Sequence, residues 1–155
     1  MADPQGNSGY LTELDIRIWL RDNNPEFNYL LDDYEFDSEE IRTATTLTVD
    51  KWNETPPFLG AEANFTVTTF PYRGMLLRGT AANLLFIAAN RYRRNSLKYN
   101  VPGGVVADQE KFTEYDSAGQ ALWTEYVNWI NHAKHAINME AGFGVAYGPV
   151  PLGSW

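Results

Sequence analysis

The strongest constraint on the fold is a long apolar seam in the second half of the chain. Its members recur with alternating spacings of three and four: Phe112, Tyr115, Gly119, Leu122, Tyr126, Trp129, Ala133 and Ala136. Such spacing is typical of one continuous helix, and Trp123, Ile130 and Ile137 widen the seam to a face suited to bundle packing. With Asp108 as N-cap, the pattern predicts a helix from about Gln109 to Glu140.

Three shorter helices are predicted before it. In the first, within residues 11–23, Thr12 and Asp15 fit a capping box, and the expected apolar side is Leu11, Leu14 and Ile18. Asp37 caps the second, from about Ser38 to Asn53. The side chains expected to be buried there are Ile41, Ala44, Thr48, Val49 and Trp52.

The third helix follows Pro71 and is apolar nearly all round between Met75 and Ala89, which predicts a central position. Its small residues leave room for close backbone approach, Gly74 and Gly79 among them. The expected fold is therefore mainly α: a bundle of about four helices in which the first three wrap the long last one.

Two irregular segments complete the layout. Val101, Pro102, Gly103 and Gly104 have the chemistry of a tight turn, which predicts a projecting hairpin or loop near 97–107. Residues 143–155 are too rich in Gly and Pro for an ordinary helix, and they are expected to form an extended C-terminal tail on a bundle domain of residues 1–142. Either the protein's own core or a neighbour has to cover the aromatic side chains of this tail.

The net charge of −8 is unevenly distributed. Residues 1–70 hold fourteen acids and four bases, whereas residues 71–107 hold six bases and no acid. The two regions are complementary and are expected to meet, within one subunit or between neighbours. A nucleic-acid patch at Arg91, Arg93 and Arg94 is the sharper alternative, but the total charge disfavours it, and a dipole-complementing role at the end of the third helix is preferred.

Sequence motifs give no basis for an enzyme. Phosphate-binding glycine loops, the nucleophile elbow and the zinc-protease helix motif are all missing, and the chain has no Cys. His132 and His135 have a spacing that suits a metal, but no third ligand is close in sequence, so neither metal nor cofactor is expected. The acids from Asp32 to Glu40 fit a solvated face or a helix start better than a catalytic pair. Neither a signal peptide nor a membrane-spanning run is recognised, which predicts synthesis in the cytoplasm and no membrane partner.

The stretches YNVPGGVVADQEKFTEY and ALWTEYVNWINHAKHAINMEAGFG resemble the second half of head-to-tail connector (adaptor) proteins from the neck of tailed bacteriophages. The matching positions are Tyr99, Gly103, Gly104, Val105, Lys134, Asn138, Phe143 and Gly144. The first half, from YLTELDIRIWLRDNNPE through EEIRTATTLTVDKWNETPP, is similar to such proteins in helix order.

The resemblance implies a virion structural protein that forms a ring, expected to have twelve copies, between the portal and a downstream neck or tail protein. The genomic DNA would pass through its lumen without sequence-specific binding. The tail would then be ordered on a neighbouring subunit or on the portal, through Phe143, Tyr147, Pro149, Pro151, Leu152 and Trp155. Arg91, Arg93 and Arg94 would pair with acids of an adjacent subunit, and the turn at 101–104 would face the next ring.

Three alternatives are weighed beside this hypothesis. A head-closure or tail-terminator ring is the nearest, although both are usually richer in β structure. A DNA-binding accessory protein would use Arg91, Arg93, Arg94 and Lys98. A small hydrolase using the acids between Asp32 and Glu40 is the weakest.

Overall fold

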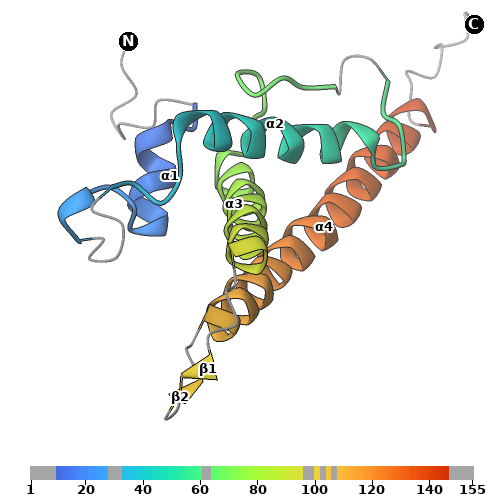
Figure 1. Ribbon diagram of the computed structural model, residues 1–155. Helices are drawn as coiled ribbons and strands as arrows, with labels where there is room; N and C mark the ends of the chain where they lie inside the picture. Colours follow the sequence, from blue (N-terminus) through green and yellow to red (C-terminus); the bar gives the residue numbers. More distant parts are fainter. Residues whose placement is uncertain are drawn as a thin grey trace, which may run out of the picture.

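The computed structural model describes residues 10–27, 33–60, 64–95, 100–101, 104–105 and 108–146. The described chain is mainly helical, as predicted, with four α-helices and a long last helix (Figure 1). The elements are α1 (Glu13–Leu20), the 3-10 turn η1 (Pro25–Phe27), α2 (Ser38–Glu54), α3 (Arg73–Asn95), β1 (Asn100–Val101), β2 (Gly104–Val105) and α4 (Asp108–Ala146).

Helix α3 occupies the centre of the bundle. Helix α3 packs against α1, α2 and α4, and its most extensive contact is with α4 (Figure 1). The predicted central position of this helix is confirmed, while the expectation that the first three helices wrap α4 is wrong. The reason lies in the side chains: α3 buries residues on several sides, including Leu76, Ala82, Leu84 and Ala88, whereas α4 keeps exposed residues along much of its length.

Local sequence signals start the first two helices, as predicted. Thr12 accepts a hydrogen bond from the backbone N–H of Asp15, and the Asp15 carboxylate accepts one from the N–H of Thr12. Asp37 and Glu40 form the same reciprocal capping box at α2. Each box satisfies two backbone donors that a helix end leaves without partners.

The apolar face predicted for α1 is confirmed at Leu11, which is partly buried against the core, and is wrong at Leu14 and Ile18. Leu14 and Ile18 are 60% and 54% exposed, and the buried residues are Ile16 and Arg17. The guanidinium of Arg17 donates to the carboxylate of Asp22 at 3.0 Å and to the carbonyl oxygen of Phe36 at 2.9 Å. These contacts turn the Arg17 side of α1 inward and leave Leu14 and Ile18 outside.

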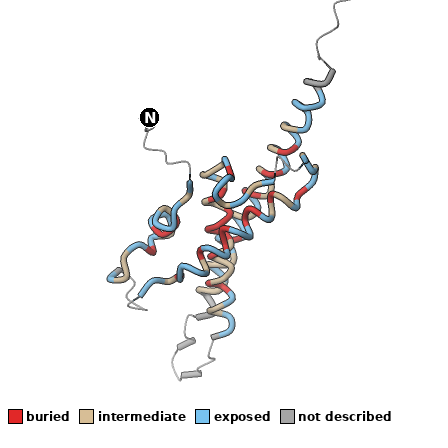
Figure 2. Tube along the Cα trace, turned by 90° about the horizontal axis from the view of Figure 1, so that it is seen from above, coloured by how far each residue is buried: buried red, intermediate tan, exposed pale blue. Residues whose placement is uncertain are grey.

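Two hydrophobic clusters stabilise the bundle, and Figure 2 shows the buried residues gathered where the helices cross. The first cluster contains Ile16, Phe36, Ile41, Ala44, Leu84 and Ala88. The second is largely aromatic and contains Val49, Trp52, Phe70, Leu76, Tyr126 and Ile130. All five side chains predicted to be buried on α2 are buried. The Trp52 ring has aromatic neighbours at centroid distances of 5.4 Å to Trp129, 5.5 Å to Tyr72, 5.7 Å to Phe70 and 6.0 Å to Phe65.

Helix α4 is longer than predicted. It reaches Ala146, so residues 143–146 are helical and the extended tail expected from Phe143 onward does not begin there. Residues 147–155 lie outside the described residues. The predicted seam is buried at Gly119 and Tyr126, whereas Ala136 is exposed.

A two-stranded antiparallel hairpin connects α3 to α4. Asn100 pairs with Val105 and Val101 with Gly104, which confirms the predicted hairpin at its two flanks. Its strands lie beyond the ends of α3 and α4 (Figure 1). Pro102 and Gly103 lie outside the described residues.

Candidate assembly surface

A groove runs between α1 and the start of α3. Its volume is about 420 Å³, and its lining residues are Leu11, Asp15, Ile18, Trp19, Arg73, Gly74 and Leu77. Trp19 is 45% exposed, and the neighbouring Tyr10 and Leu14 are about 60% exposed. The α1 helix and the residues just before it therefore present four apolar side chains that the described part of the chain leaves about half exposed, here called the apolar strip: Tyr10, Leu14, Ile18 and Trp19. Grouped exposure of this kind is characteristic of interaction surfaces.

An ion pair at the groove holds the two helices together. Arg73, at the first position of α3, lies 2.8 Å from the carboxylate of Asp15. Hydrogen bonds from Thr12 lower the pKa of Asp15, and Arg73 lowers it further. Asp15 thus has two functions, since it completes the cap of α1 and it fixes the position of α3.

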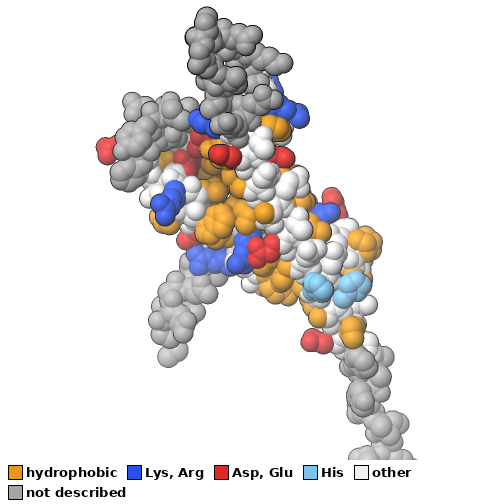
Figure 3. Space-filling view, turned by 90° about the horizontal axis from the view of Figure 1, so that it is seen from below, with side chains coloured by type: hydrophobic (Ala, Val, Ile, Leu, Met, Phe, Trp, Pro, Cys, Tyr) orange, Lys and Arg blue, Asp and Glu red, His pale blue; other side chains and the backbone are white. Residues whose placement is uncertain are grey.

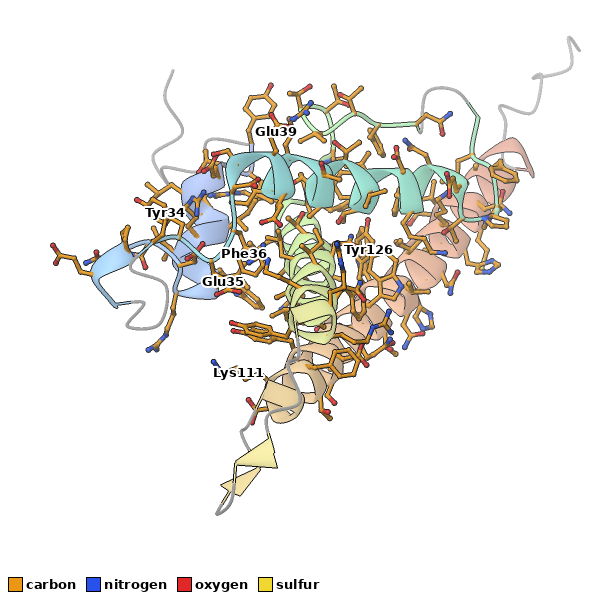
Figure 4. All side chains as sticks on the ribbon, in the orientation of Figure 1. Tyr34, Glu35, Phe36, Glu39, Lys111 and Tyr126 are labelled. Carbon is orange, nitrogen blue, oxygen red and sulfur yellow. The ribbon has the colours of Figure 1, made fainter. Side chains whose placement is uncertain are left out.

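Arg17 holds the segment before α2 against α1. Besides its bonds to Asp22 and the Phe36 carbonyl, its guanidinium lies 4.4 Å from the centre of the Tyr34 ring. The Asp22 carboxylate accepts the backbone N–H groups of Glu35 and Phe36 at 2.7 and 3.2 Å. In Figure 4, Glu35 and Phe36 lie between α1 and α3. A hydrogen-bonded ion pair of this kind fixes a loop position more strongly than exposed pairs do.

Arg91 is paired within its own chain, and its predicted role between subunits stays a prediction. Its guanidinium donates to Glu40 at 2.6 Å, to the Glu35 carbonyl oxygen at 2.7 Å and to the Glu35 carboxylate at 3.3 Å. Burial raises the pKa of Glu35, and the charge of Arg91 opposes that rise. The acidic first half and the basic middle do meet, and for Arg91 they meet inside one subunit.

Arg93 and Arg94 occupy the last turn of α3, where positive charge complements the helix dipole, and both are exposed. The guanidinium of Arg93 lies 5.9 Å from the centre of the Phe112 ring on α4. With Arg91 paired to two carboxylates, a DNA-binding patch would depend on Arg93, Arg94 and Lys98, and Lys98 lies outside the described residues. A contact of Arg93 and Arg94 with a neighbouring subunit stays a prediction.

The acids considered for catalysis have local structural roles. Asp37 and Glu40 cap α2, Glu35 and Glu40 pair with Arg91, and Glu39 forms an exposed ion pair with Arg42. Asp32 lies outside the described residues. The two histidines are exposed on the far part of α4 (Figure 3). Among the described residues, no group of three or more His, Cys, Asp or Glu side chains is placed to hold a metal ion.

Sequence patterns predicted neither the burial of Lys134 nor the exposure of Trp19. Lys134 is 3% exposed, donates to the carbonyl oxygen of Thr55 and lies 5.2 Å from the centre of the Trp52 ring. Burial lowers its pKa. The available signal was the position of Lys134, next to Ala133 on the seam. For Trp19 the signal was the run Ile16 to Leu20, which has more apolar residues than one helix face can bury.

The predicted partner residues of the tail are placed only in part. Phe143 lies within the last turns of α4, while Tyr147, Pro149, Pro151, Leu152 and Trp155 lie outside the described residues.

No protein family, curated protein or solved structure matches this chain significantly. Within the described ranges, none of the helices has the length and apolar character that crossing a membrane requires.

Proposed function

We propose that this protein is a structural component of a tailed-phage virion, a head-to-tail connector that forms a ring between the portal and the neck or tail. The observation that carries the proposal is the apolar strip on α1. Tyr10, Leu14, Ile18 and Trp19 are between 45% and 61% exposed. Covering such a strip with a neighbour removes apolar area from water, at roughly 25 cal/mol per Å².

The fold supports the same proposal. Four helices with a long last one, and a hairpin before it, follow the layout that the resemblance implies. The hairpin and the far end of α4 extend from the packed body in different directions (Figure 1), so they are available to components on two sides. A ring whose subunits each carry −8 repels phosphates, which suits a channel through which DNA slides.

The experiment is to measure the mass of the purified full chain, alone and mixed with the portal protein of the same phage, and to image the assemblies in projection. We expect a closed ring of about twelve subunits that binds the portal. A chain that stays monomeric under both conditions would contradict the proposal. A shift of duplex DNA by the isolated chain, weakening with salt, would favour the DNA-binding alternative instead.

The role of the tail is tested separately. Because α4 continues to Ala146, the deletion should begin at residue 147 and leave the helix intact. We expect a folded subunit, with unchanged helical content by circular dichroism, that fails to join its ring or the portal. Unchanged assembly would show that residues 147–155 are not an assembly element.

A further inference from the structure

The groove between α1 and α3 has the composition of a site for an extended peptide. Its walls are apolar, from Leu11, Ile18, Trp19 and Leu77, and the Asp15–Arg73 ion pair lies at the same groove. A Cβ atom added at Gly74 would meet no atom within 4 Å, so this side of the groove is open. We propose that the groove receives residues 147–155 of a second copy of this chain, an inference that rests on the proposed function.

The chemistry of that segment fits the groove. Its sequence, YGPVPLGSW, has prolines at 149 and 151, which favour the polyproline II conformation. Segments in that conformation bind aromatic-lined grooves, and their carbonyl oxygens are free to accept hydrogen bonds because the conformation has no internal ones. Trp19 supplies the aromatic wall, and Arg73 and the Trp19 indole bring N–H donors. Residues 1–9, MADPQGNSG, contain no aromatic side chain and fit less well.

Geometry favours a second copy over the same chain. The Arg73 side of the groove directly follows Tyr72, whose ring lies 5.5 Å from Trp52 near the end of α2 and 4.9 Å from Trp129 of α4. From Trp129, α4 continues to Ala146, away from the packed body (Figure 1). These 17 residues of α4 span about 25 Å at 1.5 Å per residue.

Nine residues in polyproline II conformation span about 28 Å at 3.1 Å each. If residues 147–155 returned to the groove of their own chain, nearly all of them would be needed to span the distance. Almost no residue would then remain to bind in the groove. Reaching the groove of a neighbour needs no such return. The contact is head-to-tail, since the end of one subunit binds the groove of the next, and such contacts close a ring when the rotation between neighbours is a whole-number fraction of a full turn.

The test uses two matched glutamate variants of the full chain. Ile18→Glu places a charge in the groove, whereas Leu47→Glu places one at a similarly exposed apolar residue of α2, with exposed fractions of 54% and 49%. Both variants should keep the circular dichroism spectrum of the unaltered chain. We expect ring assembly, followed by native mass spectrometry, to fall more than about tenfold for Ile18→Glu, because a docked apolar segment would leave the carboxylate unpaired. Leu47→Glu should assemble normally.

A second measurement identifies the occupant. A photocrosslinking amino acid in place of Leu152 is introduced into the isotope-labelled chain, which is then mixed with the unlabelled chain. Crosslinks should join Leu152 of one isotopic form to the Ile18–Trp19 region of the other. Crosslinks within one chain, or occupation of the groove by residues 1–9 or by the exposed Phe58 of a neighbour, would overturn the inference.

The two proposals fail in different ways. Rings that form normally with Ile18→Glu would overturn this inference and leave the connector proposal standing. Failure of the unaltered chain to form any ring, alone or with the portal, would overturn both.

Discussion

The Tyr126 hydroxyl on α4 donates a 2.7 Å hydrogen bond to the carbonyl oxygen of Thr48 on α2. Both residues are completely buried, and Gly79 of α3 lies against the Thr48 methyl group and the Tyr126 ring. Figure 4 shows Tyr126 in the region where these helices meet. This three-helix contact joins the two halves of the chain, and it defines the first two predictions.

Tyr126→Phe removes the hydroxyl and keeps the ring. We expect the free energy of unfolding to fall by about 1 kcal/mol, because a buried hydrogen bond to a backbone carbonyl is lost while packing is retained. Urea denaturation followed by tryptophan fluorescence measures the change. An unchanged denaturation midpoint would show that this hydrogen bond contributes nothing to stability.

Gly79→Ala and Gly74→Ala place the same methyl group at two positions of α3. A Cβ at Gly79 would collide with Thr48 and come within 3.2 Å of the Tyr126 ring, whereas at Gly74 it would meet nothing within 4 Å. We expect Gly79→Ala to destabilise by about 1–3 kcal/mol and Gly74→Ala to stabilise by up to about 1 kcal/mol through helix propensity. Thermal unfolding of both variants checks the opposite signs, and a shared sign would contradict the packing described.

Thr80 and Thr48 are two buried threonines with different hydrogen bonding. The hydroxyl of Thr80 has no hydrogen-bond partner within the described part of the chain. That of Thr48 donates to the Ala44 carbonyl oxygen at 2.8 Å and accepts from Asn83 at 3.0 Å. Thr80→Val should therefore stabilise, and Thr48→Val should destabilise, each by about 1 kcal/mol. Chemical denaturation measures both, and destabilisation by Thr80→Val would indicate a missed partner.

Arg91 is expected to matter for the stability of the isolated subunit. Arg91→Gln removes the pairing of Glu35, whose side chain is 13% exposed, and should lower the free energy of unfolding by about 1–3 kcal/mol. Arg94→Gln is the control, because Arg94 is exposed on the same helix turn, and it should change stability by less than about 0.5 kcal/mol. Equal effects of the two variants would argue against the intrachain pairs.

Two carboxylates in the first turn of α1, Glu13 and Asp15, predict a loss of stability in acid. Hydrogen bonds from Arg17 lower the pKa of Glu13, and those from Thr12 lower the pKa of Asp15. Because both values are below those of the unfolded chain, the stabilisation is complete above the ordinary values of 4.5 and 3.8 and is lost as the pH falls through the lowered ones. The pKa of Glu35 is raised instead, so this carboxyl group favours the folded state at low pH, and its contribution to stability is lost as the pH rises.

Asp15→Asn isolates the part due to Asp15, which includes its hydrogen bonds in the cap and its ion pair with Arg73. It should cost about 1 kcal/mol at neutral pH and weaken the dependence of unfolding on pH below 3.8. An Asp15→Asn profile that parallels the unaltered one in that range would assign the acid sensitivity to other carboxylates.

Local patterns predicted much of the fold, and non-local contacts explain the differences. The capping boxes at Thr12 and Asp37 depend on residues three apart, so the sequence reveals them. The inward face of α1 depends on Arg17 reaching Asp22 and Phe36, a contact that periodicity does not encode. The charge distribution predicted that acids and arginines meet, but it could not tell one subunit from two.

The candidate surface was less predictable from the sequence. An apolar residue on a short helix is normally assigned to the core, so Leu14 and Ile18 were expected inside. The continuation of α4 to Ala146 was also missed, because Gly142 and Gly144 suggest a helix end although each costs only about 1 kcal/mol. Packed turns that precede such glycines are enough to carry the helix through them.

The end of α4 extends past the packed core. Ile137 still packs against the aromatic cluster, while residues 138–142 are exposed and the helix continues to Ala146. Nine residues of isolated helix have little stability in water, so these last turns depend on the packed turns before them. Amide hydrogen exchange there should consequently slow when the subunit is incorporated, giving a local measure of assembly that needs no label.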